Sequence, residues 1–144
     1  MGEIVKRLMQ NIELREGEMV IADQDAGTES FGRGVEQGSD TVLIVTEPSR
    51  DLLLLAERMK YLSEGIGMRR IRVILNKVSG KKQLKYMRSH LNDRDIRWLG
   101  ALGPSEGVAL ANLMGESLSA TELQEEMDRI VRLMLDEAEM SYSK

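Results

Sequence analysis

The stretch T-V-L-I-V-T-E-P-S, residues Thr41–Ser49, shows how this chain is built. Its first six residues, Thr41–Thr46, form an apolar, β-branched run of one strand's length, which predicts a strand buried on both faces of a sheet. Pro48 ends the strand because its ring lacks a backbone donor, and Ser49 is suited to cap the first turn of a helix. A strand followed at once by a helix is therefore the expected unit.

The same unit recurs along the chain. Four apolar runs of strand length are separated by segments with helical spacing, and they lie at Met19–Asp23, Thr41–Thr46, Ile71–Leu75 and Ile96–Leu102. Ser119 and Glu122 form a capping box before the last helix. The pattern predicts an α/β fold: a doubly wound parallel sheet of about four strands with flanking helices. We expect residues 1–144 to form a single domain, because this length can bury a core unaided.

Composition narrows the possible sites and partners. The chain has no cysteine, which excludes disulfides and thiolate metal sites and fits a cytoplasmic protein. His90 has no His or Glu four residues away to form a helical metal pair, so we expect no nickel or zinc site. The net charge of −4 argues against nucleic acid as the main partner. No apolar stretch approaches the roughly 20 residues that cross a membrane, so no membrane partner is expected.

Polar residues follow the expected strands, where ligands of open parallel sheets bind. Asp23 can hold the water shell of a magnesium ion, and Gly27 lets a backbone N–H approach a phosphate. From spacing alone, an aspartate that caps a turn and a turn glycine explain these two residues equally well. Asn76 offers an amide to a base edge, and the stem of Lys77 can cover the base. Taken alone, that pair fits an ordinary turn before a helix better.

One part of a nucleotide site is missing from the sequence. No G-x-x-x-x-G-K-[ST] phosphate-binding loop (P-loop) occurs in the 144 residues. This loop, its lysine and magnesium provide most of the stabilisation of a transferred phosphate, and an aspartate and a glycine cannot replace them. We therefore expect this chain alone to bind ATP weakly and to lack hydrolytic activity.

A basic stretch stands out in an acidic chain. It contains eight Arg and Lys residues: Arg69, Arg70, Arg72, Lys77, Lys81, Lys82, Lys85 and Arg88. A solvated surface is the simpler interpretation. A docking patch for an acidic partner or for phosphate is the other.

Four segments together resemble one family. They are Val20–Asp40, Val45–Arg50, Val73–Val78 and Leu102–Leu118. In these segments the chain resembles the carboxyl-terminal part of the MinD/ParA-like ATPases, and within them the accessory ATPases that insert nickel into carbon monoxide dehydrogenase. The first segment is the most specific, because there an acidic A-G switch precedes F-G-R-G-V-E.

The resemblance implies a truncated P-loop NTPase fold that uses ATP and magnesium. Asp23 would be the Walker B acid near magnesium, Gly27 the contact to the γ-phosphate and Asn76 a base contact. The loop around Pro104 would touch the adenine edge. The family's P-loop and its Cys-x-Cys metal site precede these segments, and neither motif occurs here.

The resemblance also implies association with other chains. The family's P-loop strand lies between the strand that ends at Asp23 and the strand at Thr41–Thr46, so we expect direct pairing or another molecule to close that gap. The chain would be a homo-oligomer or would bind a separate P-loop-bearing chain, with a metalloenzyme as its client. The alternative is a non-catalytic interaction or regulatory module that keeps the fold without hydrolysis.

Overall fold

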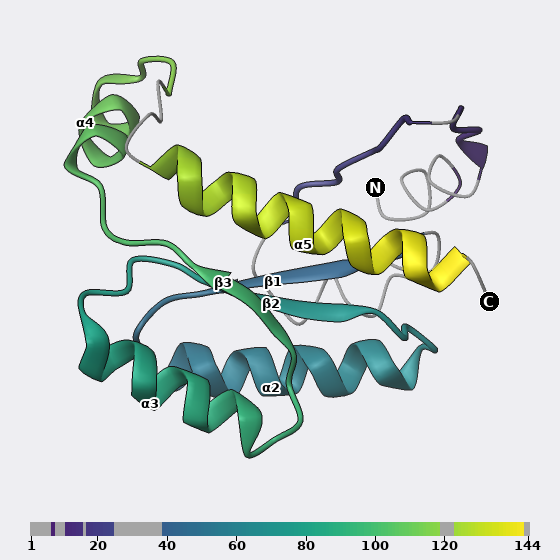
Figure 1. The fold of residues 1–144 in the computed structure, drawn as a ribbon, viewed down its shortest axis with the longest axis horizontal. Coiled ribbons are helices and arrows are strands. Elements are labelled where there is room, and N and C mark those ends of the chain that lie inside the picture. The colour runs from purple at the N-terminus through teal and green to yellow at the C-terminus, as the bar shows by residue number, and fades with distance from the viewer. Residues whose placement is uncertain (1–6, 8–10, 16, 25–38, 119–122, 143–144) are drawn as a thin grey trace. The chain divides into compact units, whose positions relative to one another are not determined.

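The structure, a computed structural model, describes residues 7, 11–15, 17–24, 39–118 and 123–142, with side chains up to residue 138 (Figure 1). The chain divides into two compact units. The first unit consists of Met1–Val42 and Arg58–Ile71, and the second unit of Leu43–Glu57 and Arg72–Lys144.

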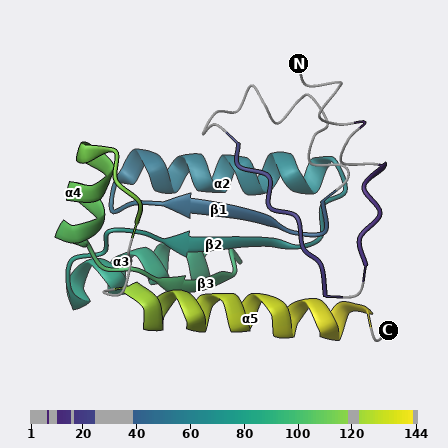
Figure 2. The ribbon, with the colours of Figure 1, turned by 90° about the horizontal axis from the view of Figure 1, so that it is seen from above.

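The described elements alternate between strands and helices. In chain order they are β1 (Val42–Thr46), α2 (Arg50–Gly65), β2 (Ile71–Leu75), α3 (Lys81–Asn92), β3 (Trp98–Ala101), α4 (Glu106–Met114) and α5 (Gln124–Tyr142). The strands form one sheet in the order β1-β2-β3, and Figure 2 shows β1 and β2 running in the same direction. The predicted α/β fold with a parallel sheet and flanking helices is confirmed.

The prediction of a first strand at Met19–Asp23 is wrong. Residues 19–23 have no regular secondary structure, and the side chains of Met19, Val20 and Ile21 are 52%, 42% and 79% exposed. A strand needs a neighbour whose backbone groups pair with its own, and an apolar run does not specify that neighbour. The described sheet therefore has three strands, and the expected pairing of Met19–Asp23 with Thr41–Thr46 does not occur within it.

Strand β1 also differs from the expected strand buried on both faces. It lies at the edge of the sheet, where Ile44 and Thr46 are buried but Leu43 and Val45 are 40% and 60% exposed. Successive side chains of a strand point to opposite faces, so one face of β1 is covered and the other is not. The apolar run predicted the strand and not its uncovered face.

Other predicted elements are confirmed. Strand β2 has the predicted limits and all of its residues are buried, whereas β3 is shorter than the predicted Ile96–Leu102. Helix α4 begins after Ser105, whose Oγ accepts a hydrogen bond from the Val108 N–H at 3.1 Å, and it ends at Gly115. The capping box at Ser119 and Glu122 lies outside the described residues.

Within the second unit, helix α5 is held against the sheet by apolar packing and by one ion pair. It contacts β3, and Figure 1 shows it on one face of that strand with α3 on the other. Ile130 of α5 packs with Ile74 and Leu99 in a buried cluster. The Arg72 Nε of β2 donates to the Glu137 Oε2 at 2.5 Å. Since Arg72 is 9% exposed, loss of Glu137 would leave a nearly buried charge without this carboxylate.

The contact between β3 and α5 depends on Gly100. A Cβ at this position would lie 2.6 Å from the Ile130 Cγ1 and 3.0 Å from its Cδ1. Helix α5 can therefore approach β3 this closely only because residue 100 has no side chain.

We predict that Gly100→Ala lowers the free energy of unfolding by about 1–3 kcal/mol, because the added methyl group overpacks the β3–α5 contact. Urea denaturation followed by the fluorescence of Trp98, the one tryptophan, measures the effect. Gly65→Ala is the control, since a Cβ there meets nothing within 4 Å. Equal stability of the two variants would contradict the prediction.

Candidate nucleotide site at the carboxyl ends of the strands

The carboxyl ends of the three strands are joined by backbone hydrogen bonds. The Asn76 N–H, just after β2, donates to the Thr46 carbonyl of β1 at 2.8 Å. On the other side, the Leu102 N–H donates to the Leu75 carbonyl at 2.8 Å and the Val78 N–H to the Leu102 carbonyl at 2.9 Å. The segments that follow the strands therefore begin at one edge of the sheet, which is where ligands of such sheets bind.

Asn76 and Lys77 form a tight turn at this edge. The Lys77 N–H donates to the Asn76 Oδ1 at 3.0 Å, so the side-chain oxygen is used locally. Lys77 has a φ of 55°, in the left-handed region that a residue with a side chain rarely adopts. Such conformations occur often at binding sites. The structure thus places two of the predicted residues together in a backbone conformation that needs an explanation.

The side chain of Lys77 reaches across to the end of β1. Its Nζ lies 2.7 Å from the Glu47 Oε1, and the two side chains are 61% and 40% exposed. An ion pair exposed to this degree contributes at most about 1 kcal/mol to stability. In this structure the Lys77 ammonium is thus paired with Glu47, a residue that the sequence analysis did not single out. The position of Glu47 directly after a predicted strand could have marked it as a candidate site residue.

Thr46 is a second residue that the sequence analysis did not single out. It is 2% exposed, and its Oγ1 has no hydrogen-bond partner among the described residues. A buried polar group without a partner costs about 1–3 kcal/mol. The hydroxyl lies on the residue whose carbonyl binds the Asn76 N–H, so the unpaired group belongs to the same edge.

Pro104 follows β3 at this edge and is exposed. It comes directly before Ser105, the cap of α4, so it lies in the turn that joins the strand to that helix. The structure therefore brings Asn76, Lys77 and Pro104 to adjacent strand ends of the second unit.

The other two predicted residues belong to the first unit. Asp23 is exposed and outside regular secondary structure, and Gly27 lies outside the described residues. The assignments of Asp23 to magnesium and of Gly27 to a phosphate remain predictions. In the described part of the chain, no three His, Cys, Asp or Glu side chains converge as a metal site. None of the described helices is long and apolar enough to cross a membrane.

Comparisons with known proteins show which proteins the chain is similar to. No family model matches the chain. It is 30% identical to an uncharacterized ATP-binding protein of Methanocaldococcus jannaschii over 128 residues, which are 89% of this chain and 49% of that protein. A second such protein of the same organism is 30% identical over 135 residues, 90% of this chain and 52% of that protein.

A third relative is the carbon monoxide dehydrogenase accessory protein CooC of Rhodospirillum rubrum. It is 28% identical over 114 residues, which cover 79% of this chain and 43% of that protein. Among solved structures, the MinD cell division protein of Aquifex aeolicus shares the fold, with a TM-score of 0.58 over 71% of this chain and 47% of that chain at 21% identity. Together, the ATP-binding relatives, CooC and the shared MinD fold support the MinD/ParA-like P-loop ATPase superfamily for this chain. This MinD/ParA-like chain spans about half the length of the curated relatives it matches.

The left-handed turn of this MinD/ParA-like chain leads to a prediction at Lys77. Glycine adopts a positive φ without the steric cost of about 1–2 kcal/mol that a Cβ meets there. We expect Lys77→Gly to be more stable than Lys77→Ala by about 1 kcal/mol, while both lose the ion pair with Glu47. Urea denaturation of the two variants measures the difference.

Lys85 provides the matched control, because it is exposed within helix α3. There the order should reverse, with Lys85→Ala more stable than Lys85→Gly by about 1 kcal/mol. The same order of stability at both lysines would show that Lys77 does not hold the left-handed conformation.

Proposed function

We propose that this chain is part of an ATP-dependent accessory protein that serves metallocentre assembly, with nickel insertion into carbon monoxide dehydrogenase as the specific task. Its similarity to ATP-binding relatives over about nine-tenths of its length carries the proposal. The similarity to a carbon monoxide dehydrogenase accessory protein supports the specific task. Nickel would be the cargo of the assembled protein, and the client would be the metalloenzyme.

The polar groups at the strand ends are suited to one side of a nucleotide. The side-chain amide of Asn76 can exchange hydrogen bonds with a base or a ribose. Lys77 can meet a phosphate oxygen if it leaves Glu47. Asp23 would hold a water of a magnesium ion, and Gly27 and the turn at Pro104 would contact the γ-phosphate and the base. Magnesium, when bound, neutralises charge on the phosphates.

A phosphate-binding loop has to come from elsewhere in this proposal. The sequence contains no such motif. We propose that a P-loop-bearing segment or chain completes the site, either in a homo-oligomer or in a complex of two different polypeptides. The assembled protein would work in the cytoplasm.

Strand β1 offers a place for that segment. The Val42 N–H donates to the Arg70 carbonyl at 2.9 Å, on the side of β2. Alternate residues of a parallel strand direct their backbone groups to opposite sides, so those of Leu43 and Val45 face the open edge. The side chains of these two residues are also exposed. An incoming strand would pair with the edge, and an element that accompanies it would cover the apolar side chains.

A non-catalytic interaction module is the second candidate. The lack of a P-loop motif in the sequence and the pairing of Lys77 with Glu47 favour it. The two candidates differ in whether a P-loop-bearing polypeptide accompanies the chain.

We predict that the chain alone binds MgATP weakly, with a dissociation constant no tighter than about millimolar, because the groups that neutralise the phosphates are missing. Calorimetric titration measures it. Saturable binding at micromolar affinity would show that the phosphate site lies within this chain and would contradict the proposed need for a second segment.

The proposed function predicts a defined complex. The tagged chain, purified from its native cells, should carry a stoichiometric polypeptide with a G-K-G-G-x-G-K-type loop, identified by mass spectrometry. The complex should bind MgATP. Asn76→Ala should weaken that binding about threefold to tenfold, the value of one hydrogen bond. Asn92→Ala, at the end of α3, is the control and should have no effect. Absence of both the polypeptide and ATP binding would support the non-catalytic module instead.

A further inference from the structure

Basic residues are concentrated in one part of this acidic chain. Residues 69–97 contain ten of its 20 Lys and Arg residues but only two of its 24 Asp and Glu residues. Helix α3 lies in this segment, and its sequence K-K-Q-L-K-Y-M-R-S-H-L-N contains no acidic residue. A positive helix in a chain of net charge −4 is a local field that a negative partner would recognise.

Three lysines of α3 are available to such a partner. Lys81, Lys82 and Lys85 are exposed and form no ion pair with any other described residue. Arg88 differs, because its guanidinium carbon lies 5.0 Å above the centre of the Trp98 ring. Arg88 therefore makes a cation–π contact with Trp98 inside the protein, whereas the three lysines are exposed to solvent.

A hollow that Lys82 helps to line lies between the start of α2 and α3. Its volume is about 310 Å³. Leu53 and Met87 line it and are 1% and 2% exposed, so they form its floor, while Pro48 and the largely exposed Tyr86 provide apolar walls. This volume is at the lower end of the about 300–1,000 Å³ of small-molecule sites, and it has room for one large side chain.

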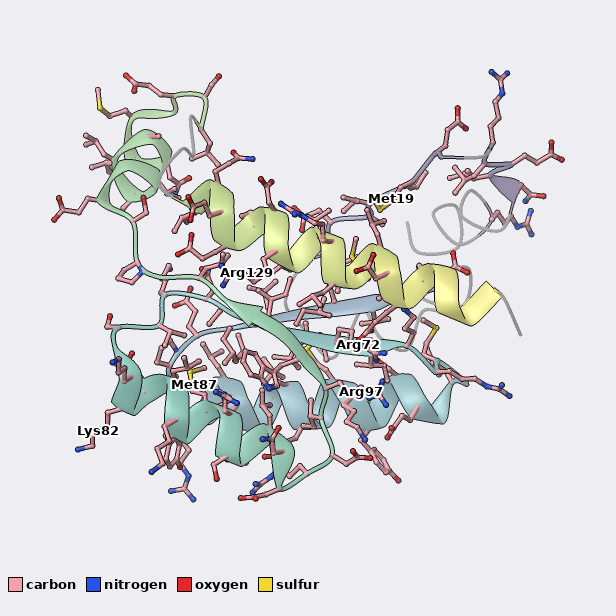
Figure 3. The ribbon with its side chains drawn as sticks, in the orientation of Figure 1. Met19, Arg72, Lys82, Met87, Arg97 and Arg129 are labelled. Atoms are coloured by element: carbon pink, nitrogen blue, oxygen red, sulfur yellow. The ribbon has the colours of Figure 1, made fainter. Side chains whose placement is uncertain are left out.

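Cationic groups border the hollow on two sides. Lys82 of α3 and Arg50 at the start of α2 both line it. Figure 3 shows Lys82 projecting away from the protein, while Met87 of the same helix points inward. Lys82, Lys85 and Tyr86 are three and four residues apart in α3, so they share one surface of the helix.

We propose that this hollow is the docking site for an acidic peptide segment of a partner protein. One large apolar side chain of the segment enters the hollow between Leu53 and Met87. Neighbouring carboxylates meet Lys82 and Lys85 on one side and Arg50 on the other. The apolar floor gives affinity, and the cations select a segment with acidic residues around its anchor.

The apolar floor favours a peptide over other negative partners. Nucleic acid is bound through phosphate contacts spread over a basic surface, which needs no apolar hollow. An anionic membrane attracts an extended basic segment. Three lysines in a chain of net negative charge provide too little positive charge for such an attraction. The combination of a hollow for one side chain with a cationic border is the pattern of peptide recognition.

Fluorescence anisotropy with two labelled peptides at low salt tests the proposal. The first is Glu-Glu-Leu-Phe-Glu-Glu, and the second replaces the central pair by Ala-Ala. The first peptide should bind saturably and at least about tenfold more tightly, since only its side chains fill the hollow. Lys82→Glu should weaken its binding about fivefold or more. Arg132→Glu, an equal charge change at an exposed position of α5, should leave the binding unchanged.

Several results would overturn the proposal. Failure of the Leu-Phe peptide to bind, equal binding of both peptides, or equal effects of the two substitutions would each exclude recognition by the hollow. Co-sedimentation with phosphatidylserine vesicles that Lys82→Glu abolishes, without any preference between the peptides, would assign the basic surface to a membrane. The MgATP titration is independent of these outcomes, so the docking site and the proposed function can fail separately.

Discussion

Every backbone N–H and C=O group that is buried in a sheet must find a partner, and strand β2 meets this requirement on both sides. Its residues are all buried, and the chain just beyond it is bonded to β1 through Asn76 and to β3 through Leu102. Because β2 is held on both sides, its end is fixed, and the turn at Asn76 and Lys77 is fixed with it. The ion pair of Arg72 with Glu137 then ties α5 to the same strand.

Among the residues that the structure describes, strand β1 meets the same requirement on one side only. Its bonds to the chain around β2 leave the backbone groups of Leu43 and Val45 at the open edge, where their side chains are also exposed. Unpaired edges of this kind readily accept another strand. The chain spans about half the length of the curated relatives it matches. The proposed P-loop-bearing segment is thus a structural completion as well as a chemical one.

The sequence predicted those features that local patterns encode. The limits of β2 followed from its apolar run, because the length of a strand is a local property of the sequence. The prediction of a strand at Met19–Asp23 was wrong, because a strand needs a neighbouring strand and an apolar pattern does not specify which segment that is. The positions of Asn76 and Pro104 at strand ends were also predictable, because each follows an apolar run that indicates a strand. The pairing of Lys77 with Glu47 and the unpaired hydroxyl of Thr46 were not, because they depend on which strands become neighbours.

Amide hydrogen exchange in β1 tests the central claim that this edge is open until a second polypeptide pairs with it. In the chain alone, at a concentration where sedimentation shows a monomer, the account predicts rapid exchange at Leu43 and Val45. Ile44 lies between them and directs its amide toward β2, so it should exchange at least about a hundredfold more slowly. Addition of the P-loop-bearing polypeptide should slow amide exchange at Leu43 and Val45 to the exchange rate of Ile44. Equal protection of all three amides in the monomer would contradict the account.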